Sequence, residues 1–141
     1  MDSWQSEALK RFPELRDRIN QTGGGIHGLW AVIFSAVVAA YGTKPVNEDF
    51  IRRAYEYAAW CVRQPQTSDA ETDLPSATAV GFLENLPLDH QVFGDLHRWL
   101  SVETFEGCKS LFCCHLSEEE YGKAHSDFIR KKKSVTQPSG G

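Results

Sequence analysis

Three cysteines and one histidine fall within ten residues, in the run GCKSLFCCHL from Gly107 to Leu116. Thiolate and imidazole groups are the ligands that zinc prefers, and an activated thiolate is also a nucleophile and a redox centre. The run therefore suggests metal binding, redox chemistry or nucleophilic catalysis. The alternative is an apolar helix in which the thiols act as small apolar side chains.

The geometry of a helix argues against a metal site in this run. Each helical residue advances by about 100°, so Cys108 and His115 share a face but lie two turns, or about 10.5 Å, apart, while Cys113 and Cys114 point to other sides. Two ligands on one helix normally lie at i, i+3 or i, i+4, and these four residues contain no such pair. We predict no metal and no cofactor, with Cys108, Cys61 and His115 in the core, Cys114 at a packing boundary and Cys113 as the exposed thiol.

A general acid or base would need a histidine beside a carboxylate in a pocket. The candidates are His90, His97 and His27, which follows the glycines of the run TGGGIHG. That run lacks the lysine and hydroxyl of a phosphate-binding loop and is predicted to be a flexible connector. We assign no catalytic residue, and an enzyme that uses one of these histidines with a carboxylate stays as an alternative.

The hydrophobic spacing is helical almost everywhere, and no alternating run predicts a strand. We predict an all-α fold: a single compact domain over residues 1–132, with six or seven helices packed as antiparallel hairpins, and a flexible polar tail over 133–141. The uncharged stretch Leu29–Tyr41 predicts a central helix that its neighbours cover on every side. Asn47 and Ser101 are predicted N-caps.

Charge is distributed unevenly along the chain, although 15 basic and 19 acidic residues leave a net charge of only −4. Residues 1–70 are balanced, whereas residues 71–127 hold eleven acidic and three basic side chains, and RKKK follows at 130–133. Nucleic-acid binding needs cations clustered on a folded face, so this pattern favours a basic partner instead. The predicted partner-binding residues are four acids that helix capping does not explain and a possible aromatic anchor: Glu84, Asp95, Glu103, Glu106 and Trp99.

The sequence predicts a cytoplasmic protein. Its four cysteines lack the regular spread of a secreted disulfide framework, and no signal-peptide pattern occurs at the start. The longest uncharged apolar run, Leu29–Tyr41, is shorter than the roughly 20 residues that cross a bilayer, so no membrane association is expected.

The runs RRAYEYAAWC, GFLENL and HRWLS, within about residues 47–115, resemble small uncharacterised bacterial helical proteins. Some of these look like the immunity partners encoded beside secreted toxins. Such proteins bind one cognate toxin, often with an acidic face against a basic nuclease. The resemblance implies a non-enzymatic protein that covers or inhibits a basic partner through its acidic C-terminal half. A structural helical module of a larger assembly is the remaining alternative.

Overall fold

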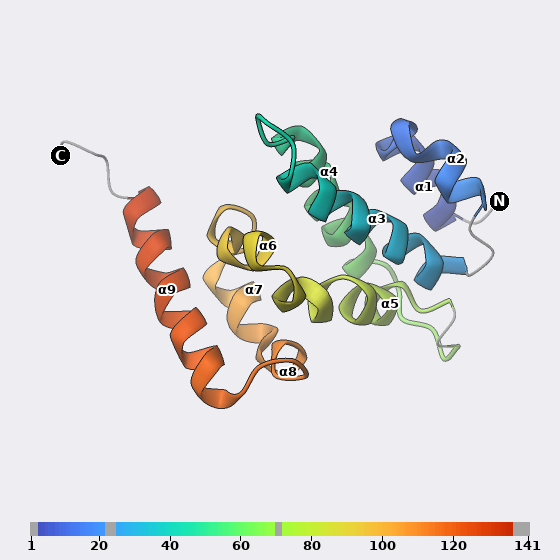
Figure 1. Cartoon of the computed structure of the whole chain (residues 1–141). Coiled ribbons are helices and arrows are strands. Elements are labelled where there is room, and N and C mark those ends of the chain that lie inside the picture. The colour runs from blue at the N-terminus through green and yellow to red at the C-terminus, as the bar shows by residue number, and fades with distance from the viewer. Residues whose placement is uncertain (1–2, 22–24, 70–71, 137–141) are drawn as a thin grey trace. The chain divides into compact units, whose positions relative to one another are not determined.

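The computed structural model describes residues 3–21, 25–69 and 72–136, and every regular element in these ranges is a helix (Figure 1). The all-α prediction is therefore confirmed. In chain order, the α-helices and the 3-10 helices (η) are α1 Ser3–Arg11, η1 Pro13–Leu15, α2 Arg16–Gln21, α3 Gly25–Tyr41, α4 Glu48–Val62, α5 Leu74–Gly81, η2 Leu83–Leu88, α6 His90–Gly94, η3 Leu96–Arg98, α7 Val102–Gly107, α8 Lys109–Phe112 and α9 Glu118–Thr136.

These elements outnumber the six or seven predicted helices because several segments are divided into shorter helices, as at residues 13–21 (η1 and α2) and 74–88 (α5 and η2). The segment from His90 to Leu100 likewise forms α6 and η3, and the cysteine run forms α7 and α8. The elements group into two compact units, Met1–Phe82 (unit 1) and Leu83–Gly141 (unit 2). Among the described helices, none is long and apolar enough to cross a membrane.

Unit 1 is built on α3, α4 and α5, which pack against one another, with α1 against α4. Its centre is aromatic: Trp30 is fully buried, stacks on Phe82 at 5.0 Å between ring centroids, and lies 5.4 Å from the Tyr57 ring. The Tyr57 hydroxyl donates a hydrogen bond to the Trp4 carbonyl oxygen at 2.8 Å, which fastens α1 to α4. The predicted cap at Asn47 is confirmed, since its side chain accepts from the first turn of α4.

Close packing of α5 on α3 depends on Gly81. A Cβ atom at this position would lie 2.7 Å from the Cβ of Trp30, closer than side-chain carbons approach. A residue with any side chain would therefore force the two helices apart, which makes Gly81 a packing requirement of unit 1.

The prediction that α3 is covered on every side is wrong. Trp30 and Val37 are fully buried, but Ala31, Ser35 and Ala39 are exposed along one side at helical spacing. Small uncharged side chains are tolerated both in a core and at a surface, so the lack of charge did not identify a covered face. The helix also begins at Gly25, inside the glycine run predicted to be a connector, and residues 22–24 lie outside the described ranges.

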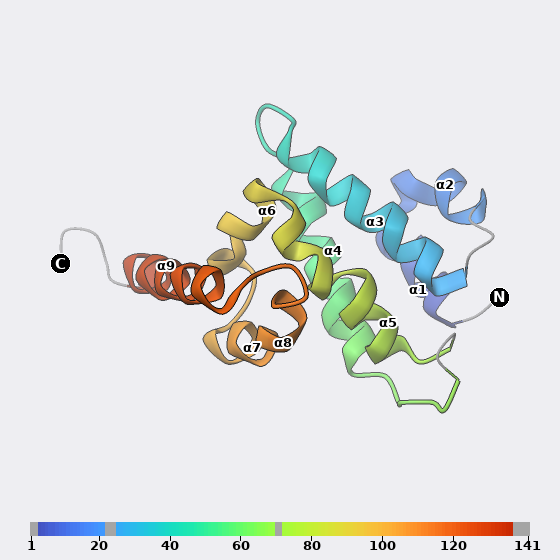
Figure 2. The same ribbon diagram turned by 60° about the horizontal axis from the view of Figure 1, so that its bottom comes forward.

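The core of unit 2 is a second aromatic cluster that joins α7 and α9, with α9 seen nearly end-on in Figure 2. The Phe105 and Phe128 rings stack at 4.2 Å, and Phe105 also packs against Phe112 and Tyr121. Ser117 and Glu120 begin α9 by accepting each other's backbone N–H groups.

The basic run at the end of α9 holds this helix in place. Lys131 Nζ donates to the Gly94 carbonyl oxygen at 2.7 Å, and Lys132 Nζ donates to the carbonyl oxygens of His97 and Leu100 at 2.9 and 2.8 Å. These carbonyl groups lie at the end of α6, in η3 and just after it, where a cation is stabilising. The helix passes the boundary predicted at residue 132 and continues to Thr136, and residues 137–141 of the predicted tail lie outside the described ranges.

Candidate functional site

The cysteine-rich run does not form one continuous helix. α7 ends at Gly107, and Cys108, with φ −90° and ψ 4°, separates it from α8. The predicted burial of Cys108 and Cys61 is confirmed, and burial raises the pKa of both thiols, that of Cys61 to about 11. Both are therefore protonated at neutral pH and inert as nucleophiles. In the part of the chain that the structure describes, no three His, Cys, Asp or Glu residues are grouped so that they could hold a metal ion.

The predicted exposure of the last residues of this run is wrong. Cys114 is exposed and Cys113 is half-buried, the reverse of the prediction, and His115 is exposed instead of in the core. The α8 helix ends at Phe112, so the next residues leave the helical path on which the prediction was based. The surface thiol of this run is therefore Cys114.

Most acidic side chains of residues 71–127 already have a local partner. The carboxylates that pair with a cation or a backbone N–H group include Asp89 with Val92, Glu106 with His125, Glu118 with Lys109, Glu119 with Lys123, and Asp127 with Arg130 and Lys131. Glu84 and Glu103 differ, because the described residues contain no hydrogen-bond or ion-pair partner for either carboxylate. Both belong to the predicted partner-binding set.

Two predicted residues, Glu103 and Glu106, lie one turn apart on the short helix α7. Glu103 is exposed, and the Glu106 side chain is 51% exposed. Glu106 Oε2 lies 2.8 Å from Nε2 of His125 on α9, and this contact becomes an ion pair when the imidazole is protonated. Ser101 starts α7 by accepting the Thr104 N–H group, which confirms its predicted cap.

Asp95 and Trp99 lie together around η3, whereas Glu84 is half-buried on η2. The indole Nε1 of Trp99 donates to Asp95 Oδ2 at 3.2 Å, and Nη1 of Arg98 lies 3.3 Å from the same oxygen. The Arg98 guanidinium also lies over the Trp99 ring, 5.0 Å from its centroid. Asp95 is only 19% exposed, so its carboxylate orients Trp99 and is poorly placed to meet a partner.

A pocket of about 350 Å³ within unit 2 brings together two of the three candidate histidines, His90 and His97. Asp127 and Lys131 of α9 also line it, and no local sequence pattern predicts their position there. In the described ranges neither histidine hydrogen-bonds to a carboxylate, so no acid–base pair is assembled there. The third candidate, His27, is exposed on α3 in unit 1.

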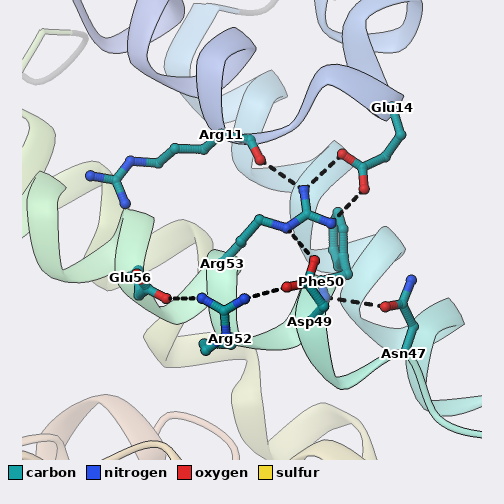
Figure 3. Close-up of polar contacts among 8 residues, drawn as sticks. All are labelled: Arg11, Glu14, Asn47, Asp49, Phe50, Arg52, Arg53 and Glu56. Atoms are coloured by element: carbon teal, nitrogen blue, oxygen red, sulfur yellow. Dashed lines mark hydrogen bonds and ion pairs between the residues drawn. The ribbon is translucent and has the colours of Figure 1, made fainter.

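Unit 1 contains a charged network around Arg53 that no local sequence pattern predicts (Figure 3). The Arg53 guanidinium binds both carboxylate oxygens of Glu14 at 2.8 and 2.6 Å, the Arg11 carbonyl oxygen at 2.8 Å and Asp49 at 2.9 Å. Hydrogen bonding from Arg53 lowers the pKa of Glu14 and so favours the charged carboxylate. Each charge in the network is matched within unit 1, so its role is to hold α1 and η1 against α4.

Comparisons with protein-family models, with curated proteins and with solved structures found no match to this chain.

Proposed function

We propose that this protein is a non-enzymatic binding protein that recognises a basic protein partner through unit 2. The observation that carries the proposal is the pair Glu103 and Glu106 on α7, two exposed carboxylates one turn apart. Glu103 has no partner in the described residues, and Glu106 contacts only a partly exposed histidine there. A lysine or arginine of a partner can reach both carboxylates without breaking a buried contact.

Trp99 is the proposed aromatic anchor in the interface with the basic partner. Its indole is held from one side by Asp95 and covered by Arg98, so its position is set before binding. A side chain that is already ordered loses less conformational entropy on association, and tryptophan is enriched among residues that dominate binding energy. The proposed contact set is therefore Glu84, Trp99, Glu103 and Glu106, with Asp95 as the residue that positions Trp99.

A basic toxin, such as a nuclease, is the partner that fits this proposal most specifically. Acidic surfaces attract basic proteins over long range and accelerate their association. The likeness of RRAYEYAAWC, GFLENL and HRWLS to immunity proteins supports the same class of partner. In this proposal the protein acts in the bacterial cytoplasm, where it would neutralise the toxin.

The test is affinity capture from the native host with the wild-type chain and two double variants. E103K/E106K reverses the proposed contact carboxylates, and E118K/E119K reverses two exposed carboxylates in the first turn of α9 with the same change in net charge. We expect E103K/E106K alone to lose the captured protein, and raised salt to weaken capture by the wild type. Equal capture by all three chains, unchanged by salt, would refute electrostatic recognition and would favour the structural-module alternative.

A further inference from the structure

His125 on α9 contacts one of the two carboxylates that the proposed function assigns to the partner. Its Nε2 lies 2.8 Å from Glu106 Oε2, and the His125 side chain is 32% exposed, so it exchanges protons with solvent. Histidine ordinarily changes its charge between about pH 5 and pH 8, whereas a glutamate on a protein surface and a lysine or arginine of a partner largely keep theirs. The imidazole therefore controls the net charge of this contact near neutral pH.

Two aromatic rings hold this imidazole between α7 and α9. Its centroid lies 5.9 Å from that of the Tyr121 ring, one turn earlier on α9, and 6.0 Å from that of the Phe105 ring on α7. Phe105 directly precedes Glu106 and is buried. The core of unit 2 therefore positions both the imidazole and the backbone that carries the carboxylate, unlike an ion pair between two freely moving surface side chains.

The other titratable and charged groups that face His125 or its stacked neighbour Tyr121 keep their charge in this pH range. They come from α8 and α9, and are Lys109, Tyr121, Arg130 and Lys133. Lysine and arginine titrate far above neutral pH, and burial raises the pKa of Tyr121, so its hydroxyl stays neutral. From α7, Glu106 supplies the one carboxylate in contact with this imidazole among the described residues.

Protonation of His125 changes what a partner meets at Glu106. A carboxylate only accepts hydrogen bonds, so a neutral imidazole donates from Nε2 to Oε2 and leaves the negative charge intact. Oε1 makes no contact in the described ranges and is open to a cation of the partner. An imidazolium in the same place neutralises the carboxylate and repels any cation that approaches Oε1. Glu103 and Glu106 together carry two negative charges, and the imidazolium cancels one of them.

We propose that His125 regulates partner binding through its protonation: the surface binds its basic partner when the imidazole is neutral and binds it more weakly in mild acid. This inference rests on the proposed function, because it requires Glu106 to contact the partner. The two binding events are linked, so a cation bound at Glu106 in turn opposes protonation of His125.

The probe is a peptide of ten lysines, whose charge does not change between about pH 5.5 and pH 7.5. Isothermal titration calorimetry measures its affinity for the full chain at both pH values and at constant ionic strength. We expect the wild type to bind about 3–10-fold more weakly at the lower pH. His125→Asn keeps a hydrogen-bond donor for Glu106 but cannot be protonated, so it should remove most of this difference. The matched control, His115→Asn, replaces an exposed histidine of unit 2 and should keep the difference.

Failure of this inference can be distinguished from failure of the proposed function. If E103K/E106K binds the peptide as well as the wild type at pH 7.5, or if the wild type does not bind it, recognition of basic groups by these carboxylates is contradicted and the inference falls with it. If E103K/E106K loses binding, but the wild type is insensitive to pH or H125N weakens in acid as much as the wild type, the regulatory role of His125 alone is overturned.

Glu106→Gln tests the same contact without a change at His125. The imidazolium then has no carboxylate to neutralise, so E106Q should also show a reduced pH dependence, and the full wild-type dependence in E106Q would overturn the role of this contact. Circular dichroism at both pH values checks that the variants fold. If H125N does not fold, the comparison of E106Q with the wild type decides the matter.

Discussion

Arg53 joins the first helices of unit 1 to α4, and its replacement by alanine removes several contacts at once (Figure 3). Its hydrogen bond to the partly buried Arg11 carbonyl is charge-assisted and worth about 1.5–3 kcal/mol. The bidentate pair with the 45% exposed Glu14 adds at most about 1 kcal/mol, and the guanidinium over the Phe50 ring adds about 0.5 kcal/mol. Water recovers part of this loss, so we expect Arg53→Ala to lower the free energy of unfolding by about 2 kcal/mol, a large share of a typical 5–15 kcal/mol.

Urea denaturation followed by far-UV circular dichroism measures this change. The neighbouring Arg52→Ala is the matched control, because Arg52 is 52% exposed and bonds only within its own helix, to Asp49 and Glu56. We expect no resolvable change in the free energy of unfolding for R52A. Arg53→Lys keeps the charge but loses the planar guanidinium that binds Glu14 with two nitrogens, so we expect about half the decrease seen for R53A. If R53A matched R52A, or R53K matched the wild type, the proposed role of this guanidinium would be wrong.

The effect should also depend on pH in a known direction. Arg53 lowers the pKa of Glu14 from its ordinary value of 4.5, so the charged carboxylate stabilises the folded state. This contribution is complete above the unfolded-state pKa and is lost as the pH falls through the lower folded-state pKa. The difference in free energy of unfolding between wild type and R53A should therefore become smaller in acid. The same difference at pH 7 and pH 3 would contradict the ion pair.

Three further predictions test packing, helix docking and thiol exposure. Gly81→Ala places a Cβ 2.7 Å from a buried tryptophan and should lower the free energy of unfolding by about 1–3 kcal/mol, whereas Gly107→Ala meets nothing within 4 Å and should not. Lys132→Ala removes two hydrogen bonds to carbonyl groups, so it should lower the free energy of unfolding by about 1–2 kcal/mol and speed amide hydrogen exchange in α9. The control is Lys123→Ala, which should change neither quantity because the Lys123 side chain is 78% exposed. A thiol reagent should label Cys114 rapidly in the folded protein, and the two buried thiols only on unfolding; equal rates for all would contradict the burial pattern.

The helical class and several helix starts could be predicted because they depend on local chemistry. Asn47, Ser101 and Ser117 each accept a backbone N–H group of the first turn, and this needs only the right residue at the right position. Cys108 lies three residues after Phe105 and four before Phe112, so its burial follows from helical spacing. Apolar spacing and caps therefore predict where several helices begin and which class of fold they form.

The breaks within helices and the long-range contacts could not be predicted in the same way. The chain departs from the helix at Cys108, directly after Gly107, but a single glycine is often tolerated within a helix. It departs again after Phe112, where neither proline nor glycine stands. Arg53 and Glu14 are 39 residues apart in the sequence, and no local pattern predicts the contact between them. Likewise, the sequence RKKK alone predicts exposed cations. Which carbonyl oxygens accept hydrogen bonds from Lys131 and Lys132 depends on how α9 packs in unit 2.

The lysines near the end of α9 affect how far this chain can be shortened. A terminus that is rich in charge and ends in glycine would ordinarily be trimmed to improve expression or crystallisation. A chain cut before Lys131 would leave the ends of α6 and η3 without their ammonium donors and would shorten the helix that covers Phe105. Truncated forms should therefore retain every residue through Lys132, since these two lysines join α9 to the ends of α6 and η3.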